Sequence, residues 1–125
     1  MREIKFRAWD SRHKVMEMID DLYWFEEAGV HEIEDGKAQS PSGNYTFMQY
    51  TGLKDKNGVE IYEGDIYKWR SYRVKDGKQL RPENVTVVTF DPQELYKLYC
   101  LVSDGNVEVI GNIHENPELL EGKQC

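Results

Sequence analysis

Segment 68–81 combines cationic and aromatic side chains in a pattern that could bind nucleic acid. Its cations are Lys68, Arg70, Arg73, Lys75, Lys78 and Arg81, with Asp76 as the single acid and with Trp69 and Tyr72 between them. Cations neutralise phosphates and aromatic rings stack on bases, which are the two contacts that single-stranded nucleic acid requires. A strand, however, would point Lys68 and Arg70 to one face and Trp69 to the other.

The charge of the whole chain favours a protein partner for this segment. The net charge is −7, and residues 10–36 hold nine acids against two cations. An acidic protein repels a polyanion, whereas a basic hairpin can complement an acidic patch on a second subunit or on another protein. We therefore predict a homo-oligomer or another protein partner, with nucleic-acid binding as the alternative. The predicted contact residues are Lys68, Trp69, Arg70, Tyr72, Arg73 and Lys75, with Trp24 and Phe25 as apolar anchors.

The sequence offers little that could catalyse a reaction or hold a metal. It contains no Gly-x-Ser-x-Gly elbow, no glycine-rich phosphate loop and no Cys-x-x-Cys pair. Residues 55–58 begin like a calcium loop, but Val59, Glu60 and Ile66 stand where that loop needs an oxygen ligand, a glycine and a glutamate. His31, Glu32, Glu34 and Asp35, even with His13, follow no ligand spacing, and a solvated acidic loop is the preferred interpretation. We predict no enzyme activity, no metal and no cofactor.

The first residues, the lengths of the apolar runs and the cysteines indicate the cellular compartment of the protein. The first residues lack the apolar core of a signal peptide, and no apolar run approaches the roughly 20 residues of a membrane span. Cys100 and Cys125 predict two thiols rather than a disulfide framework. These features lead us to expect a cytoplasmic protein without a membrane partner.

Alternation of apolar and polar residues predicts many short strands. Strands are expected at residues 3–9, 15–19, 22–25, 30–33, 45–50, 59–62, 66–72, 85–90 and 107–113. Turns are expected at residues 34–37, 57–58, 63–65 and 75–78, because each contains a glycine. Residues 95–102 fit either a strand or a helix. Asn116 followed by Pro117 predicts one short helix over residues 117–120.

Short strands with frequent glycine turns and no long helical period indicate an all-β, mainly antiparallel fold, either a sandwich or a small barrel. Residues 36–44 are rich in Gly, Pro and Ser and form the predicted linker. We accordingly expect an N-terminal β appendage over residues 1–44, which could take part in an oligomer interface. Residues 45–125 would form the main β domain with the short helix at its end.

Three stretches carry a family resemblance. They are residues 1–10 (MREIKFRAWD), 48–66 (MQYTGLKDKNGVEIYEGDI) and 107–120 (VEVIGNIHENPELL). In this order and spacing they resemble the YopX family of bacteriophage and prophage proteins. The resemblance implies a phage-derived protein of uncharacterised function, an SH3-like barrel in the C-terminal part and self-association, and it supplies no catalytic residue. The acidity of the chain allows a third role for such a phage protein, in which segments 10–36 and 91–125 imitate DNA for a host DNA-binding protein.

Overall fold

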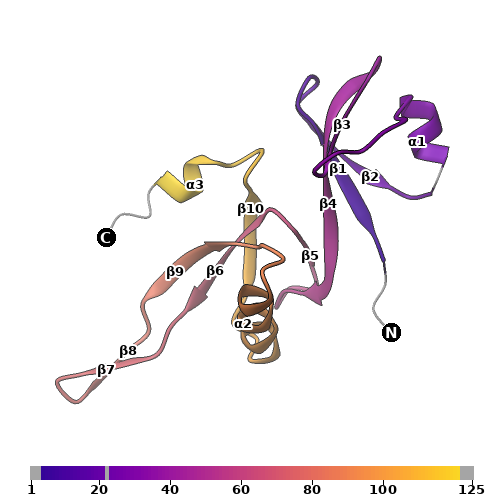
Figure 1. Cartoon of the computed structure of the whole chain (residues 1–125). Helices are drawn as coiled ribbons and strands as arrows, with labels where there is room; N and C mark the ends of the chain where they lie inside the picture. Colours follow the sequence, from indigo (N-terminus) through magenta and orange to yellow (C-terminus); the bar gives the residue numbers. More distant parts are fainter. Residues whose placement is uncertain (1–3, 22, 122–125) are drawn as a thin grey trace. The chain divides into compact units, whose positions relative to one another are not determined.

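The computed structural model describes residues 4–21 and 23–121 (Figure 1). The chain is mostly β, and all of its strand pairings with a known register are antiparallel, as the sequence predicts. Its contacts divide it into two compact units, Met1–Gly52 and Leu53–Cys125. Strand β4 (Gly43–Lys54) is continuous across the predicted boundary at residues 44 and 45. Each unit is described in turn.

The first unit contains a four-strand path with a short helix. Its elements are β1 (Phe6–Asp10), β2 (Val15–Ile19), α1 (Tyr23–Ala28), β3 (Lys37–Ser40) and β4, and the strand order is β2-β1-β4-β3. The strands predicted near residues 3–9 and 15–19 are confirmed, with residue 3 outside the described residues. The turn predicted at residues 34–37 is also confirmed. Asp35 and Gly36 have φ values of 52° and 72°, which suit a type I′ turn.

Three predictions for this region are wrong. Residues 23–25 begin a helix instead of a strand, and Leu22 lies outside the described residues. Residues 30–33 form no strand, and the predicted linker at 36–44 is the β3–β4 hairpin. Aromatic residues misled the first prediction, because they can be buried from a helix as well as from a strand. Trp24 makes edge contacts with Tyr45 and Phe47 of β4, at centroid distances of 5.0 and 6.0 Å.

The second unit holds a three-stranded sheet of order β10-β6-β9, a separate hairpin and two helices. The elements are β5 (Glu60–Tyr62), β6 (Asp65–Arg70), β7 (Arg73–Lys75), β8 (Lys78–Leu80), β9 (Glu83–Val87), α2 (Pro92–Ser103), β10 (Glu108–Asn112) and α3 (Glu118–Glu121). Residues 95–102, which fit either a strand or a helix in the sequence, lie in helix α2. Asp91 caps it by accepting a hydrogen bond from the N–H of Glu94, and Pro92 occupies its first turn.

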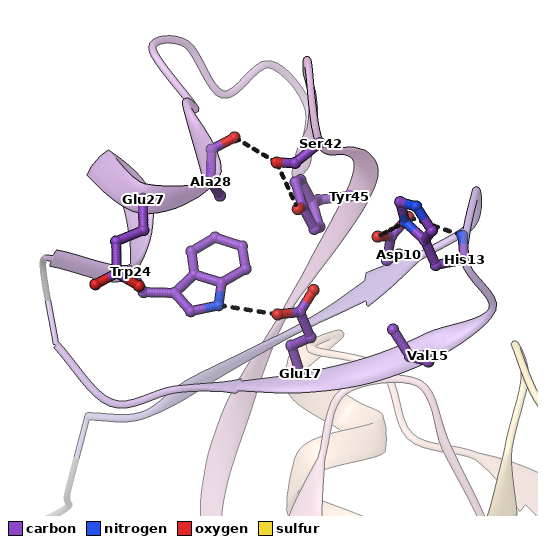
Figure 2. Close-up of a pocket in the computed structure, with 9 residues that line it drawn as sticks. All are labelled: Asp10, His13, Val15, Glu17, Trp24, Glu27, Ala28, Ser42 and Tyr45. Atoms are coloured by element: carbon purple, nitrogen blue, oxygen red, sulfur yellow. Dashed lines mark hydrogen bonds and ion pairs between the residues drawn. The ribbon is translucent and has the colours of Figure 1, made fainter.

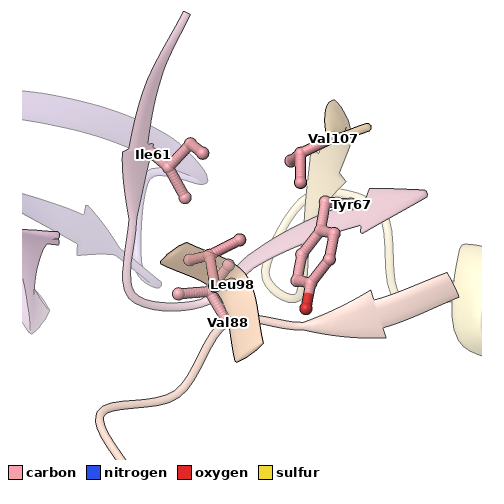
Figure 3. Close-up of a cluster of buried hydrophobic side chains, with 5 residues drawn as sticks. All are labelled: Ile61, Tyr67, Val88, Leu98 and Val107. Carbon is pink, nitrogen blue, oxygen red and sulfur yellow. The ribbon is translucent and has the colours of Figure 1, made fainter. Parts of the chain in front are cut away.

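A small apolar core holds this unit together. Ile61, Tyr67, Val88, Leu98 and Val107 are almost completely buried and gather between the sheet and α2 (Figure 3). The strand pairings of the described residues do not close a barrel, so the SH3-like barrel stays a prediction. Among the described residues, no helix is long and apolar enough to cross a membrane.

Buried polar side chains fix the turns of the second unit. Oδ1 of Asp55 accepts hydrogen bonds from the N–H groups of Asn57 (2.8 Å) and Val59 (2.9 Å). Oδ2 of the same carboxylate accepts from the N–H of Val109 (3.0 Å), which ties the turn to β10. Only Gly58 has a positive φ there, so this turn is not of type I′. Asp65 caps the next turn by accepting from the N–H of Tyr62 at 2.8 Å.

At the end of β10, the side-chain amides of two asparagines accept hydrogen bonds from the backbone. Oδ1 of Asn112 accepts from the N–H groups of His114 (3.0 Å) and Glu115 (2.9 Å), and Oδ1 of Asn116 accepts from the N–H of Asn112 (3.2 Å). A Cβ atom on Gly111 would lie 2.5 Å from that Asn116 oxygen. Glycine is therefore required here for close approach. The side chain of Asn116 thus caps the end of β10 and not the start of the short helix α3.

We predict that Asp55→Ala lowers the free energy of unfolding by about 2–4 kcal/mol, because three backbone N–H groups lose their acceptor in a largely buried site. Asp55→Asn should also destabilise the fold, since its NH₂ group cannot accept a hydrogen bond. Urea unfolding followed by circular dichroism measures both, with the exposed Lys54→Ala as the control. A loss no greater than that of the control would contradict the capping role.

Candidate functional site

The cations of β6 are engaged in ion pairs with the neighbouring strands. Nζ of Lys68 lies 3.2 Å from Oε1 of Glu108 on β10 and 3.9 Å from Oε2 of Glu83 on β9. Nη2 of Arg70 lies 3.5 Å from the same Glu83 oxygen. Two of the predicted contact residues therefore lie side by side, but their charges are already balanced within the unit.

Trp69 faces away from these cations, as strand alternation predicts. Its indole packs against the core and Nε1 donates a hydrogen bond to Oγ1 of Thr86 at 3.0 Å. Nζ of Lys97 on α2 lies 4.3 Å from the centre of its ring, close enough for a cation–π contact. Because this half-buried ring is held by contacts with Thr86, Lys97 and the core, it would have to leave Lys97 before a base could stack on the same face.

Asn106 and the backbone near Pro82 hold the base of the β7–β8 hairpin. The side-chain NH₂ of Asn106 donates to the carbonyl of Arg70 at 2.8 Å, and its Oδ1 accepts from the N–H of Arg70 at 3.0 Å. The N–H of Ser71 donates to the carbonyl of Pro82 at 3.0 Å. The strands that lead into the hairpin are thus fixed to the sheet.

The hairpin itself extends away from the sheet and from α2 within the second unit (Figure 1). Asp76 and Gly77 have φ values of 53° and 75°, so the predicted turn is confirmed as type I′. In the pairings of the described residues, β7 and β8 pair only with each other. The hairpin is therefore a two-stranded ribbon with two open edges.

The exposed side chains of the hairpin and its base include apolar groups and cations, together with Asp76 in the turn and Gln79. Tyr72, Val74 and Leu80 are 59%, 61% and 40% exposed. Lys75 and Lys78 stand directly opposite each other, and no described acid lies within ion-pair distance of either. Arg73 is paired with Leu80 in the register. Of the six predicted contact residues, Tyr72, Arg73 and Lys75 thus belong to this projecting element or its base.

Val74 and Leu80 were missed as candidate contact residues. The signal was available in the alternation of residues 73–75 and 78–80, which puts an apolar residue among cations in a segment with no further strand to cover it. The predicted anchors Trp24 and Phe25 contribute to an aromatic cluster in the first unit. Phe25 stacks on Phe47 with a centroid distance of 5.7 Å.

The first unit contains a second candidate, an open pocket of about 480 Å³ between α1, the start of β2 and β4 (Figure 2). Six of its lining residues matter for its chemistry: Asp10, His13, Glu17, Trp24, Glu27 and Tyr45. Nε1 of Trp24 donates a hydrogen bond to Oε1 of Glu17 at 3.4 Å, and the ring of Tyr45 supports the indole from the side. Carboxylates and an aromatic ring therefore share one cavity.

Asp10 is buried at the edge of this pocket, with 2% of its surface exposed. Oδ2 accepts from Nδ1–H of His13 at 2.6 Å, and Oδ1 accepts from the N–H groups of Arg12 (2.9 Å) and His13 (3.2 Å). A Cβ on Gly43 would lie 2.5 Å from Oδ2, so only glycine allows this approach of β4. Burial alone would raise the pKa of the Asp10 carboxyl. The hydrogen bonds from His13, Arg12 and Asn44 outweigh burial and hold the pKa below its usual value of 3.8.

The rejected metal candidates lie elsewhere in the first unit. His31, Glu32, Glu34 and Asp35 border a broad depression of about 890 Å³. Within residues 4–21 and 23–121, no group of three or more His, Cys, Asp or Glu side chains is arranged to hold a metal ion.

Comparison with known proteins gives a family match and a similar solved structure. A family model described as YopX protein matches residues 5–121. The crystal structure of protein EF1440 from Enterococcus faecalis is similar over 96% of this chain and 99% of that chain, with 30% sequence identity and a TM-score of 0.50. A search of curated proteins returns no match.

We predict that Asp10 makes stability depend on pH in the acid range. Its folded-state pKa is lowered, so its contribution is present above the unfolded-state pKa and is lost as the pH falls through the folded-state pKa. The difference in unfolding free energy between wild type and Asp10→Asn should therefore narrow as the pH is lowered from about 5 to about 2. Urea unfolding across this range measures it, with Asp20→Asn as an exposed control. A constant difference would refute the assignment.

Proposed function

The chain belongs to the YopX family, and we propose that it is a non-enzymatic module that binds a protein partner through its β7–β8 hairpin. The observation that carries this proposal is a hairpin that pairs only with itself in the described chain while Tyr72, Val74 and Leu80 stay exposed. An isolated two-stranded hairpin is at best marginally stable in water. A partner that covers it would bury apolar surface and pair its open edges.

The composition of the hairpin suits a protein interface. Tyrosine is common among the residues that dominate binding energy, and apolar side chains surrounded by polar ones are typical of an interface core and its rim. Lys75 and Lys78 would form the charged part of that rim. Each is exposed and has no described ion-pair partner, so an acidic surface on the partner would improve the electrostatics of both molecules.

The family resemblance and the sequence support further proposals about the origin, compartment, assembly and fold of the protein. We place the protein in the cytoplasm of a host cell as a phage-derived, oligomeric module whose second unit is a variant of an SH3-like barrel. Its partner would be a second copy or a host or phage protein. The absence of catalysis is supported by the use of the buried carboxylates Asp55 and Asp65 as backbone caps.

Nucleic-acid binding by segment 68–81 is the alternative, and the geometry of β6 argues against it. Lys68 and Arg70 would have to leave Glu83 and Glu108 to reach phosphates, and Trp69 would have to leave Lys97 and the core to reach a base. These rearrangements cost free energy before any contact with nucleic acid forms. The free cations of the hairpin tip remain available to either partner class.

We predict that Tyr72→Ser combined with Val74→Ser reduces the recovery of a protein partner by about tenfold or more, since central apolar contacts usually dominate binding. A tagged copy is purified from the host with and without nuclease, and the associated proteins are quantified by mass spectrometry. The matched control is Tyr99→Ser combined with Val59→Ser, at exposed positions outside the hairpin. Loss of the associated material on nuclease treatment would instead favour nucleic-acid binding. Equal recovery by both variants would exclude the hairpin as the contact.

A further inference from the structure

We propose that the pocket of the first unit receives the lysine side chains at the hairpin tip, Lys75 and Lys78, of a second copy of this chain. This inference rests on the proposed function and names the partner surface that the hairpin fits. The pocket and the hairpin belong to different units, so each copy would offer one half of the contact to the next copy.

The pocket has an aromatic wall that is held in place. The Trp24 indole is fixed by its hydrogen bond to Glu17 and by edge contacts with Tyr45 and Phe25, at centroid distances of 5.0 and 5.3 Å. Figure 2 shows the ring beside the open space, with Glu17 below it and Glu27 on the same helix. A cation beside an indole gains cation–π attraction, and an adjacent carboxylate adds a charge-assisted hydrogen bond.

The charges around this wall are negative and available. No described cation lies within ion-pair distance of Glu17 or Glu27. The nearby Arg12 is turned to the carbonyl of Pro41, to which its Nη1 donates at 3.0 Å. Asp10 is already satisfied by His13 and by backbone N–H groups, so it shapes the pocket rather than binding the ligand. The pocket of about 480 Å³ has room for the end of a lysine side chain.

The hairpin tip carries positive charges that complement the negative charges of the pocket. Lys75 and Lys78 are directly opposite each other in the register, and like charges in that position destabilise a hairpin. The cations of β6 are balanced by Glu83 and Glu108, whereas these two lysines have no described acidic partner. An acidic pocket on a second copy would relieve their repulsion. The two lysines of the hairpin tip and the two glutamates of the pocket are therefore opposite in sign.

Such a contact joins unlike surfaces, so it is heterologous and builds a ring or a filament instead of a symmetric pair. The test uses two charge-reversal variants of the full chain. One carries Lys75→Glu with Lys78→Glu, and the other carries Glu17→Lys with Glu27→Lys. Lys54→Glu and Glu32→Lys serve as exposed controls. Thermal unfolding confirms that each variant is folded, and sedimentation velocity over a range of concentrations measures self-association.

We expect each double variant alone to self-associate about tenfold or more weakly than wild type, and an equimolar mixture of the two to recover association, because both reversed and original charge pairs can form in it. In the mixture, the indole N–H signal of Trp24 in an NMR spectrum should shift. That shift reports occupation of the pocket directly.

Three results would overturn the inference: a wild type that does not self-associate, a mixture that fails to recover association, or a Trp24 signal that does not move. If only the hairpin variant loses assembly and the co-purified partner, the proposed function stands and the pocket is not the receptor. If neither variant alters assembly or partner recovery, the proposed function fails as well.

Discussion

The structure depends on buried side-chain oxygens that accept hydrogen bonds from the backbone N–H groups of tight turns. A buried N–H without an acceptor is costly, and a small antiparallel fold has many turns to satisfy. Asp10 does this in the first unit, and Asp55, Asp65 and Asn112 do it in the second. Each lies in one of the three stretches that resemble the YopX family. The polar residues that give the chain its family character are therefore part of its architecture.

Because the buried acids accept backbone hydrogen bonds, the exposed charged side chains are the groups that can make contacts with other molecules. On β6 the cations are balanced by acids of the neighbouring strands, so that surface is close to neutral. On the β7–β8 hairpin, Lys75 and Lys78 have no described ion-pair partner, and they accompany the exposed apolar side chains of Val74 and Leu80. A surface of that kind is suited to binding another protein. The proposed partner contact follows from this difference between the strand and the hairpin that continues it.

The sequence predicts an element well where the spacing of its apolar residues identifies it. It predicts an element poorly where contacts with distant residues determine the structure. Alternation is sufficient to predict β1 and β6, and the residue types of Asp76 and Gly77 are sufficient to predict their turn. Helix α1 was missed because Trp24 and Phe25 are half-buried by contact with Phe47, more than twenty positions away. The Ser and Pro residues taken for a linker make a hairpin turn. The balance of Lys68 by Glu108 could not be predicted, because only the pairing of β6 with β10 brings them together.

Amide hydrogen exchange of the hairpin tests the central claim most directly. In dilute protein the N–H groups of residues 73–80 should exchange fast, since a two-stranded ribbon is only marginally stable. At concentrations where the chain assembles, or with its purified partner, these same amides should become strongly protected while the exposed face of α2 does not change. Slow exchange in the dilute protein, or protection that appears elsewhere and leaves residues 73–80 unaffected, would contradict the account.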